Sequence, residues 1–336
     1  MQADGRQVRV IVRAIEEPAE DVRLFALVPE TGMATPYPAG SHLTVTLPVG
    51  DRILTRCYSL IGEFPVDGAW RIAVKRVVPS RGGSAAMWAL APGAALSVTE
   101  PQSHFDLALG RPDYLLIAGG IGITPILGMA ERLVRLGHRP RLVYAARKRS
   151  QMAFVDRLQA LLGDRLALVV DEDGGRLELA REIAGLHADG EIYMCGPAGM
   201  MAAARAAWQA AGRTPTGLRF ETFGSSGARP ATAFKVHVRD HARDILVPPD
   251  RSLLDVLADE GIELAYDCLR GECGLCVVDV TAAAGTLDHR DVFLSPHQKQ
   301  AATKLCACVS RADADITIDT GYRPALARAR AISDHM

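Results

Sequence analysis

The sequence has no apolar run long enough to cross a membrane and no excess of charge of either sign. A spanning helix needs about 20 consecutive apolar residues, and no stretch of the 336 residues approaches this. The first residues, MQADGRQVRV, lack the apolar segment of a secretory signal. The formal net charge of −1 gives no global attraction to nucleic acid or to an anionic membrane. We therefore expect a cytoplasmic protein that binds neither.

The sequence also lacks a histidine cluster, because its nine histidines are scattered. Its seven cysteines are not evenly spread: five of them lie between Cys268 and Cys308. This grouping fits a metal site in a reducing compartment better than a disulfide framework. The length and the 49% hydrophobic content predict two or three ordinary globular domains.

Three of these cysteines have the spacing of an iron–sulfur ligand loop. Cys268, Cys273 and Cys276 form C-x4-C-x2-C, which is half of a plant-type [2Fe–2S] site and requires one more cysteine downstream. Cys306 and Cys308 are both candidates for this fourth ligand. A zinc site is the alternative, but zinc ligands usually come as two closely spaced pairs, whereas the first spacing here is four residues.

Two glycines within this loop support the same interpretation. Gly271 and Gly274 allow the backbone to turn tightly and to approach a cluster closely. The surrounding segment, residues 233–320, is acidic, with nine Lys or Arg against fifteen Asp or Glu. This charge indicates either a docking face for a partner or an ordinary solvated surface.

Residues 1–108 have the pattern of an antiparallel β-barrel. Short, roughly alternating β-branched segments are separated by turns that contain glycine and proline. The predicted strands are residues 8–12, 22–28, 41–47, 53–60, 71–77 and 95–100.

Two features of this region exceed the strand pattern. In one of the strands, Arg56, Tyr58 and Ser59 place a guanidinium, a phenol and a hydroxyl where they could hold a planar polar ring. The segment from Ser80 to Ser84 places two glycines and an arginine before a predicted helix. Free backbone N–H groups and an arginine at a helix start are suited to a phosphate group.

Residues 109–226 alternate between strands and helices, which predicts a doubly wound α/β domain with a mostly parallel sheet. The turn from Gly119 to Pro125 follows a strand and opens a helix, and we expect Thr124 to cap that helix and Pro125 to lie in its first turn. The turn is not the G-x-G-x-x-G fingerprint, and no acidic residue stands at the usual distance to bind a ribose. Cys195-Gly196-Pro197 follows another strand, at the edge where such sheets bind ligands.

Residues 227–336 read as a linker, a small α+β domain and a tail. The linker covers residues 227–232. Residues 234–239 and 245–247 predict a hairpin, and Ser252 is placed to cap a helix over residues 253–260. The cluster loop follows, and residues 321–336 form a basic tail rich in alanine and arginine.

Taken in order, these segments resemble the phthalate dioxygenase reductase family, which includes the reductases of vanillate O-demethylases. The resemblance spans about residues 8–319. The segments that carry it are Arg56-x-Tyr58-Ser59-Leu60, Arg81-Gly82-Gly83-Ser84, Gly119-Gly120-Ile121-Gly122-Ile123-Thr124-Pro125, Cys195-Gly196-Pro197, Phe220-Glu221-x-Phe223, the cysteine loop, Asp288-His289-Arg290-Asp291 and Cys308-Val309-Ser310-Arg311.

The resemblance implies three domains: an FMN-binding barrel over residues 1–108, an NADH-binding α/β domain over 109–226 and a β-grasp-like [2Fe–2S] ferredoxin domain over 233–320. Arg56, Tyr58 and Ser59 would contact the isoalloxazine of the flavin. The remaining cofactor-binding residues that we expect are Lys75, Arg81, Gly82, Gly83 and Ser84 for FMN and Gly119, Gly120, Gly122, Thr124, Pro125, Cys195, Gly196, Pro197 and Phe223 for NADH and the ring.

The resemblance also selects a fourth cluster ligand. The family ligand stands two residues before a Ser-Arg pair, which is Cys308 here, whereas the spacing of simple ferredoxins favours Cys306. We choose Cys308, and we expect strand alternation to point only one of the two thiols at the cluster.

The expected activity is that of an NADH-dependent oxidoreductase. Electrons would pass from NADH through FMN and the [2Fe–2S] cluster to a Rieske non-haem iron oxygenase of an aromatic ring-hydroxylating or O-demethylating system, and the cofactors would carry the chemistry without catalytic side chains. We expect a monomer. The alternatives are an FAD-bearing reductase for another acceptor and a non-enzymatic ferredoxin-like electron carrier. NADPH stays open because Arg147-Lys148-Arg149 could hold a 2′-phosphate.

Overall fold

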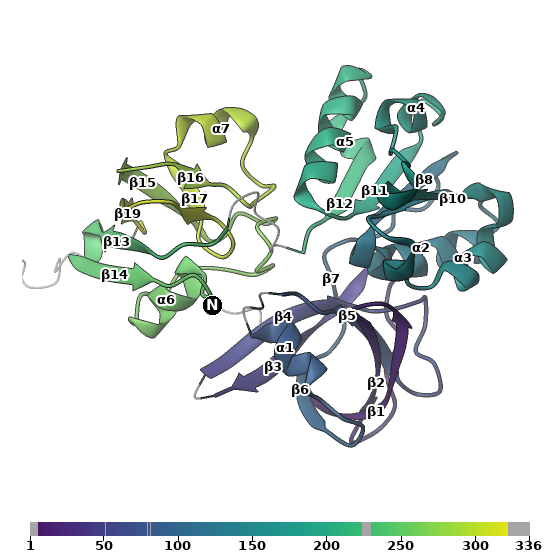
Figure 1. Cartoon of the computed structure of the whole chain (residues 1–336), viewed down its shortest axis with the longest axis horizontal. Coiled ribbons are helices and arrows are strands. Elements are labelled where there is room, and N and C mark those ends of the chain that lie inside the picture. The colour runs from purple at the N-terminus through teal and green to yellow at the C-terminus, as the bar shows by residue number, and fades with distance from the viewer. Residues whose placement is uncertain (1–5, 51, 79, 81, 224–229, 322–336) are drawn as a thin grey trace, which may run out of the picture. The chain divides into compact units, whose positions relative to one another are not determined.

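The computed structural model describes residues 6–50, 52–78, 80, 82–223 and 230–321 (Figure 1). The chain divides into two compact units, with the boundary after Phe223. The first unit contains an antiparallel barrel and a parallel α/β sheet, and the second contains a smaller mixed sheet. None of the helices in the described ranges is long and apolar enough to cross a membrane.

The barrel is a single antiparallel sheet in the order β4-β3-β6-β1-β2-β5, with β7 added on β3. A bridge between Leu60, just after β4, and Ile72 in β5 brings the two end strands together. Inward side chains such as Val45 and Trp70 are completely buried, as alternation along half-buried strands requires. The elements are β1 Gln7–Ala19, β2 Val22–Pro29, β3 Ser41–Val49, β4 Arg52–Ser59, β5 Trp70–Lys75, α1 Gly83–Trp88, β6 Ala95–Thr99 and β7 Gln102–Ser103.

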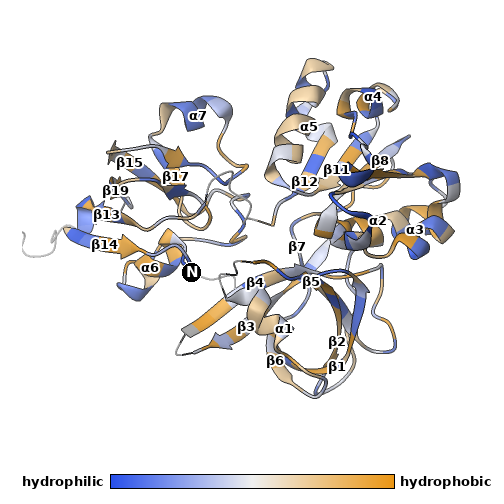
Figure 2. Ribbon diagram, in the orientation of Figure 1, coloured by the Kyte–Doolittle hydropathy of each residue, from blue (hydrophilic) through white to orange (hydrophobic). Residues whose placement is uncertain are grey.

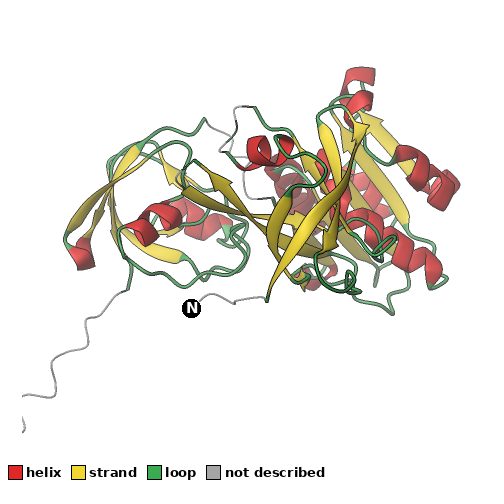
Figure 3. Cartoon of the chain, turned by 90° about the horizontal axis from the view of Figure 1, so that it is seen from below, coloured by secondary structure: helices red, strands yellow, loops and turns green. Residues whose placement is uncertain are grey.

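The second sheet of this unit is parallel, in the order β10-β9-β8-β11-β12. The winding direction reverses between β8 and β11, so helices cover both faces (Figures 1 and 3). Every residue of β8 is buried, and this strand is hydrophobic in Figure 2. The elements are β8 Tyr114–Gly119, α2 Ile123–Arg135, β9 Arg141–Ala146, α3 Val155–Leu162, β10 Leu166–Val170, α4 Leu179–Ala184, β11 Glu191–Cys195, α5 Ala198–Ala210 and β12 Leu218–Glu221.

The loop after β4 joins the barrel to helix α2. Glu63, whose side chain is only 7% exposed, accepts hydrogen bonds from Arg132 and Arg135 of this helix at 2.6–3.0 Å. Gly62 lies so close to Gly128 of α2 that a Cβ atom on Gly128 would stand 2.4 Å from the Gly62 carbonyl oxygen. The ion pairs of the buried Glu63 and this close backbone contact therefore help to hold the barrel against the α/β sheet, together with a hydrophobic core that residues of both share.

The second unit is a five-stranded mixed sheet in the order β14-β13-β19-β15-β17, with a small β16-β18 pair. β13 and β19 are parallel, and the other pairs are antiparallel. Both helices begin with a capping box, Ser252 with Asp255 and Ser295 with Gln298. The elements are β13 Phe234–Val238, β14 Arg243–Val247, α6 Leu253–Asp259, β15 Val277–Ala283, β16 Leu287–Asp288, α7 Pro296–Ala301, β17 Lys304–Cys306, β18 Arg311–Ala312 and β19 Ile316–Asp319.

Candidate flavin, nucleotide and cluster sites

Strand β4 carries the residues expected to face a flavin ring. Ser59 is buried, and its hydroxyl donates a hydrogen bond of 3.2 Å to Glu221 Oε2 at the end of β12. Burial raises the pKa of the Tyr58 phenol, and the neighbouring Arg56 guanidinium opposes this rise only partly. Tyr58 therefore stays neutral and can donate a hydrogen bond. The Ser59–Glu221 bond brings this strand to the edge of the α/β sheet.

Arg56 also reaches the expected phosphate segment. A Cβ atom on Gly83 would lie 2.8 Å from Arg56 Nε and 2.9 Å from its Cγ, so only glycine leaves room for this side chain at the start of α1. Gly82 has a φ of 95°, which favours glycine. The structure therefore brings Arg56, Gly82 and Gly83 together, while Arg81 lies outside the described residues.

Two serines organise the same turn. The Ser80 hydroxyl accepts the backbone N–H groups of Gly82 and Ala85 at 3.1 and 3.4 Å and lies 3.1 Å from the Ser84 hydroxyl. Backbone donors are thus already directed toward one oxygen atom, as a phosphate-binding turn requires. Lys75 stands at the end of β5, the strand before this turn.

The two turns expected to bind a dinucleotide touch each other at the switch point between β8 and β11. A Cβ atom on Gly122 would lie 2.1 Å from the Cys195 carbonyl oxygen, and one on Gly119 would lie 2.6 Å from Pro197 Cδ. Gly120, with a φ of 53°, faces open space. Gly119 and Gly122 therefore allow the two turns to pack closely against each other. Gly120 leaves its backbone exposed, and a pyrophosphate could approach there.

The expected helix cap at Thr124 is wrong. The cap residue of α2 is Gly122, and Thr124 is the second residue of the helix. Its buried hydroxyl donates a 3.0 Å hydrogen bond to the carbonyl oxygen of Ile121, which closes the turn from inside. Pro125 does lie in the first turn of the helix, as expected. The hydroxyl thus stabilises the Gly-rich turn rather than a helix end.

Glu221 is a site residue that the sequence reasoning did not assign. Its side chain is buried and accepts the Ser59 hydrogen bond. The signal was its position at the carboxyl end of a strand of the parallel sheet, beside Phe223. Phe223 is partly buried against the core of the same unit.

In the second unit, the cysteine loop wraps around the sulfur of Cys268. Cys268 Sγ accepts the backbone N–H groups of Arg270, Glu272 and Cys273 at 3.3–3.4 Å. Gly271 and Gly274 have φ values of 75° and 77°, as expected of a tight turn.

Both glycines are also closely packed. A Cβ atom on Gly271 would lie 2.6 Å from Val309 Cγ2, and one on Gly274 would lie 2.2 Å from the Phe293 ring. Larger residues at either position would therefore displace the loop, independently of the strain that their φ values would cause.

The thiols of this unit form two groups. Cys268 is hydrogen-bonded to Cys273, and Cys276 to both Cys306 and Cys308. Hydrogen bonds from the Cys306 and Cys308 thiols lower the pKa of Cys276 to about 3. Burial raises the pKa of Cys268, against the three backbone N–H groups.

This pairing suits a binuclear cluster. Within the described ranges, no three His, Cys, Asp or Glu side chains are arranged to hold a metal ion. In a [2Fe–2S] cluster four cysteines are shared between two irons. The pair Cys268 and Cys273 could serve one iron, and Cys276 with either Cys306 or Cys308 could serve the other. The donor set therefore fits the cluster that the spacing predicted.

The expectation that strand alternation would separate Cys306 from Cys308 is wrong. β17 ends at Cys306, and Ala307 to Val309 form a turn in which Ser310 N–H donates to the Cys306 carbonyl oxygen. Because of this turn both thiols face Cys276, so alternation does not decide between the two ligands.

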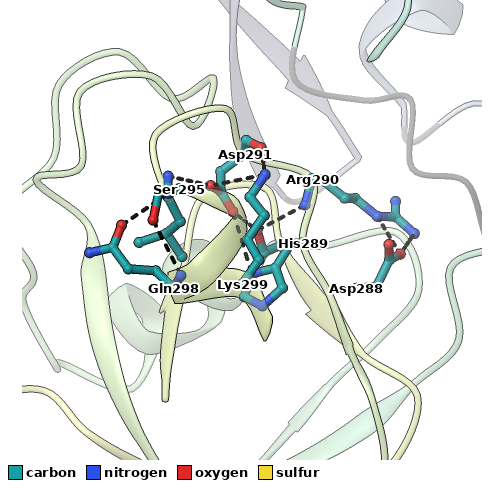
Figure 4. Close-up of polar contacts among 9 residues, drawn as sticks. Asp288, His289, Arg290, Asp291, Ser295, Gln298 and Lys299 are labelled. Atoms are coloured by element: carbon teal, nitrogen blue, oxygen red, sulfur yellow. Dashed lines mark hydrogen bonds and ion pairs between the residues drawn. The ribbon is translucent and has the colours of Figure 1, made fainter. Parts of the chain in front are cut away.

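Beside the loop, residues Asp288 to Asp291 form a buried polar network (Figure 4). Arg290 pairs with Asp288 at 2.6 Å, and both side chains are largely buried. The buried Asp291 carboxylate accepts hydrogen bonds from the Ser310 hydroxyl and the Leu294 N–H group. This network ties the segment before α7 to the turn that carries Cys308, so these four residues have a structural role beside the loop.

Comparisons with known proteins agree with these sites. Residues 236–313 match the 2Fe-2S iron-sulfur cluster binding domain, and residues 116–206 match the oxidoreductase NAD-binding domain. The chain is 37% identical to the phenoxybenzoate dioxygenase subunit beta of Ectopseudomonas oleovorans over 93% of this chain and 97% of that protein. It is 32% identical to the vanillate O-demethylase oxidoreductase of Pseudomonas putida, over 93% and 99%. The solved phthalate dioxygenase reductase is 31% identical, with a TM-score of 0.77 over 94% of this chain and 98% of that one.

The barrel, the parallel sheet and the cysteine loop together define an NAD-linked flavin and iron–sulfur oxidoreductase. More narrowly, the chain belongs to the phthalate dioxygenase reductase family. The expected fold class and the expected cofactors, FMN, NADH and a [2Fe–2S] cluster, are confirmed by this membership.

Proposed function

We propose that this protein is the reductase component of a Rieske-type oxygenase system that hydroxylates aromatic rings or removes O-methyl groups. One observation carries the proposal. In the first unit, the flavin-facing strand β4 is hydrogen-bonded through Ser59 to Glu221 at the edge of the nucleotide-binding sheet, and the same chain carries paired cluster thiols. One polypeptide therefore carries both a site that can accept two electrons from a nicotinamide coenzyme and a cluster site that can pass on single electrons.

The flavin would be held by β4 and the turn before α1. Arg56 and the backbone N–H groups around Gly82 and Gly83 supply positive charge and donors for the FMN phosphate, and Arg81, Ser84 and Lys75 complete the set. Tyr58 and Ser59 would contact the ring. A bound flavin supplies the conversion of one two-electron step into two one-electron steps.

The nicotinamide coenzyme would lie across the carboxyl edge of the parallel sheet. The turn from Gly119 to Pro125 would bind the pyrophosphate, and Cys195-Gly196-Pro197 would direct the nicotinamide toward Ser59. Because the two turns are in contact, they form one rigid support for the coenzyme. Glu221 would fix the orientation of the Ser59 hydroxyl, and Phe223 would lie near the ring.

Cys268, Cys273, Cys276 and Cys308 would be the cluster ligands. The choice of Cys308 is supported by its place in the Cys308-Val309-Ser310-Arg311 segment, and Ser310 is anchored to the buried Asp291. The acceptor would be a separate oxygenase, as the names of the two curated relatives indicate for those proteins. The protein would act as a monomer, with residues 1–108, 109–226 and 233–320 as its three domains.

Spectroscopy of the purified protein tests this proposal. The expected protein contains one flavin, two irons and two labile sulfides, and NADH bleaches both the flavin and the cluster absorbance. Mass analysis of the released flavin distinguishes FMN from FAD. Electron transfer to a purified Rieske oxygenase, followed by the loss of its cluster absorbance, tests the acceptor. Iron without reduction by NADH would instead show an electron carrier and refute the proposal.

A further inference from the structure

The cluster loop of the second unit carries an exposed apolar pair. In the described part of this unit three large hydrophobic side chains are exposed, namely Leu246, Leu275 and Phe293. Leu275 stands between Cys273 and Cys276 and is 54% exposed, and Phe293 is 47% exposed. Leu246 lies on β14, at the edge of the sheet. Isolated exposed hydrophobic residues are ordinary on protein surfaces, but two beside one functional loop indicate a contact surface.

The backbone fixes Phe293 over the loop. The N–H groups of Val292 and Phe293 both donate to the Gly271 carbonyl oxygen, at 3.0 and 3.2 Å. The ring lies so close to Gly274 that a Cβ atom there would stand 2.2 Å from it. Leu275 follows Gly274 directly, so the two apolar side chains flank the same turn. Because Phe293 is held before a partner arrives, association costs less side-chain entropy.

The same turn contains the most exposed thiol of the unit. Cys273 is partly exposed, whereas the other four cysteines of this unit are buried. In the ligand set proposed above, Cys273 is therefore the ligand nearest to solvent. An electron acceptor must come close to the cluster, and this is the side from which it meets the least protein.

The exposed charge beside the loop is negative. Glu263 is exposed and Asp267 is half-buried, and both precede the first cluster cysteine. Arg270, the cation of the loop, is buried and faces Glu272 at 3.5 Å. Lys299 of α7 contacts the Asp291 carboxylate at 3.5 Å. A surface that complements this one is therefore apolar at its centre and basic at its rim.

We propose that Leu275 and Phe293, on the Cys273 side of the loop, form the surface that docks the oxygenase, and that the oxygenase meets it with an apolar patch rimmed by lysine or arginine. This inference rests on the proposed function, because it names the surface that the same acceptor uses. A donor joined covalently to the cluster unit has a high effective concentration and needs little recognition. A separate acceptor meets the unit by diffusion and needs apolar anchors and charge steering.

Binding of the oxidised holoprotein to a purified Rieske oxygenase tests the inference without turnover. Calorimetry should show that L275S and F293S each raise the Kd about tenfold, as truncation of an interface anchor does. F293L keeps an apolar side chain and should recover most of the loss. The wild-type Kd should rise as salt is added, because salt screens exposed opposite charges. NADH should bleach the cluster absorbance of every variant at the wild-type rate.

L246S is the matched control. Leu246 is 58% exposed in the same unit, so this variant loses a similar exposed side chain away from the loop and should bind like the wild type. Iron analysis shows whether each loop is intact, and L275S decides alone if F293S loses iron because its ring packs on Gly274.

Three results would overturn the inference. They are an equal loss of binding in L246S, an unchanged Kd in L275S, and an unchanged Kd with slower bleaching by NADH. The last result would assign the surface to the flavin-bearing unit of this chain. A wild type that neither binds nor reduces a Rieske oxygenase would instead refute the proposed function.

Discussion

Replacing Gly128 by alanine tests how the barrel and the nucleotide-binding sheet are joined. Gly128 lies inside helix α2, where alanine is normally the better residue by about 1 kcal/mol. Here the added methyl would stand 2.4 Å from the Gly62 carbonyl oxygen and 2.9 Å from its carbon. Both contacts are with backbone, and the following residue, Glu63, is fixed by Arg132 and Arg135. The loop therefore cannot give way without disturbing the ion pairs that the buried Glu63 carboxylate forms with the two arginines.

The sign of the effect on stability depends on whether the cost of overpacking exceeds the gain in helix propensity. Overpacking costs about 1–3 kcal/mol in well-packed sites, and the upper part of that range applies because the neighbour is anchored backbone. After the helix gain is subtracted, we expect G128A to destabilise the first unit by about 1–2 kcal/mol. For a unit of this size this lowers the Tm by about 2–8 °C. The rate of flavin reduction by NADH should also fall, because the shift separates β4 from the coenzyme edge.

Gly199 provides the comparison. It lies in helix α5, and nothing stands within 4 Å of a Cβ atom placed on it. G199A should therefore leave the Tm unchanged or raise it slightly. Calorimetry and stopped-flow absorbance of the two variants measure both effects. If G128A is as stable as G199A and reduces flavin at the wild-type rate, the contact at Gly62 does not set the geometry of the unit.

Three further predictions concern single residues. C308S should lose most of the bound iron and labile sulfide, whereas C306S should retain them, and equal loss in both would contradict the choice of Cys308. E221A leaves the buried Ser59 hydroxyl without this acceptor and should destabilise the protein by about 1–3 kcal/mol in urea denaturation; E221Q keeps an acceptor and should cost less, so equal costs would refute this role. Burial alone would raise the pKa of Asp291, but the neighbouring His289 ring, hydrogen bonds from the Leu294 N–H and the Ser310 hydroxyl, and the charge of Lys299 lower it. A carboxyl whose pKa is lowered by folding stabilises the protein above its usual pKa of about 4, and this stabilisation is lost as the pH falls through the folded value. The difference in the free energy of unfolding between wild type and D291N should therefore shrink in acid. A difference that does not change with pH would contradict this prediction.

The sequence predicted the features that depend on local patterns. Alternating β-branched segments indicated the barrel, and the change to strand–helix alternation indicated the parallel sheet. The C-x4-C-x2-C spacing indicated the cluster loop, because ligand spacing in a short loop is a property of the chain itself. These patterns are local, so they can be seen without knowledge of the tertiary structure.

Features that depend on tertiary contacts were missed or predicted wrongly. Thr124 has the residue type of a helix cap, but the turn before it forms a further 3₁₀ segment from Gly120 to Gly122, which moves its hydroxyl inside the helix. The two candidate ligands Cys306 and Cys308 have strand spacing, but the strand ends at the first of them. In each case a backbone turn of three residues changed the direction of a side chain.

The three amide groups directed at Cys268 also bear on how this site can vary in evolution. Their donors belong to the backbone of Arg270, Glu272 and Cys273 and depend on the left-handed turns at Leu269 and Gly271. Exchanging a side chain that the loop exposes, such as Leu275, would leave these donors in place. Exposed side chains of this loop can therefore differ between homologues that have different redox partners, while the three backbone hydrogen bonds to the Cys268 sulfur stay the same.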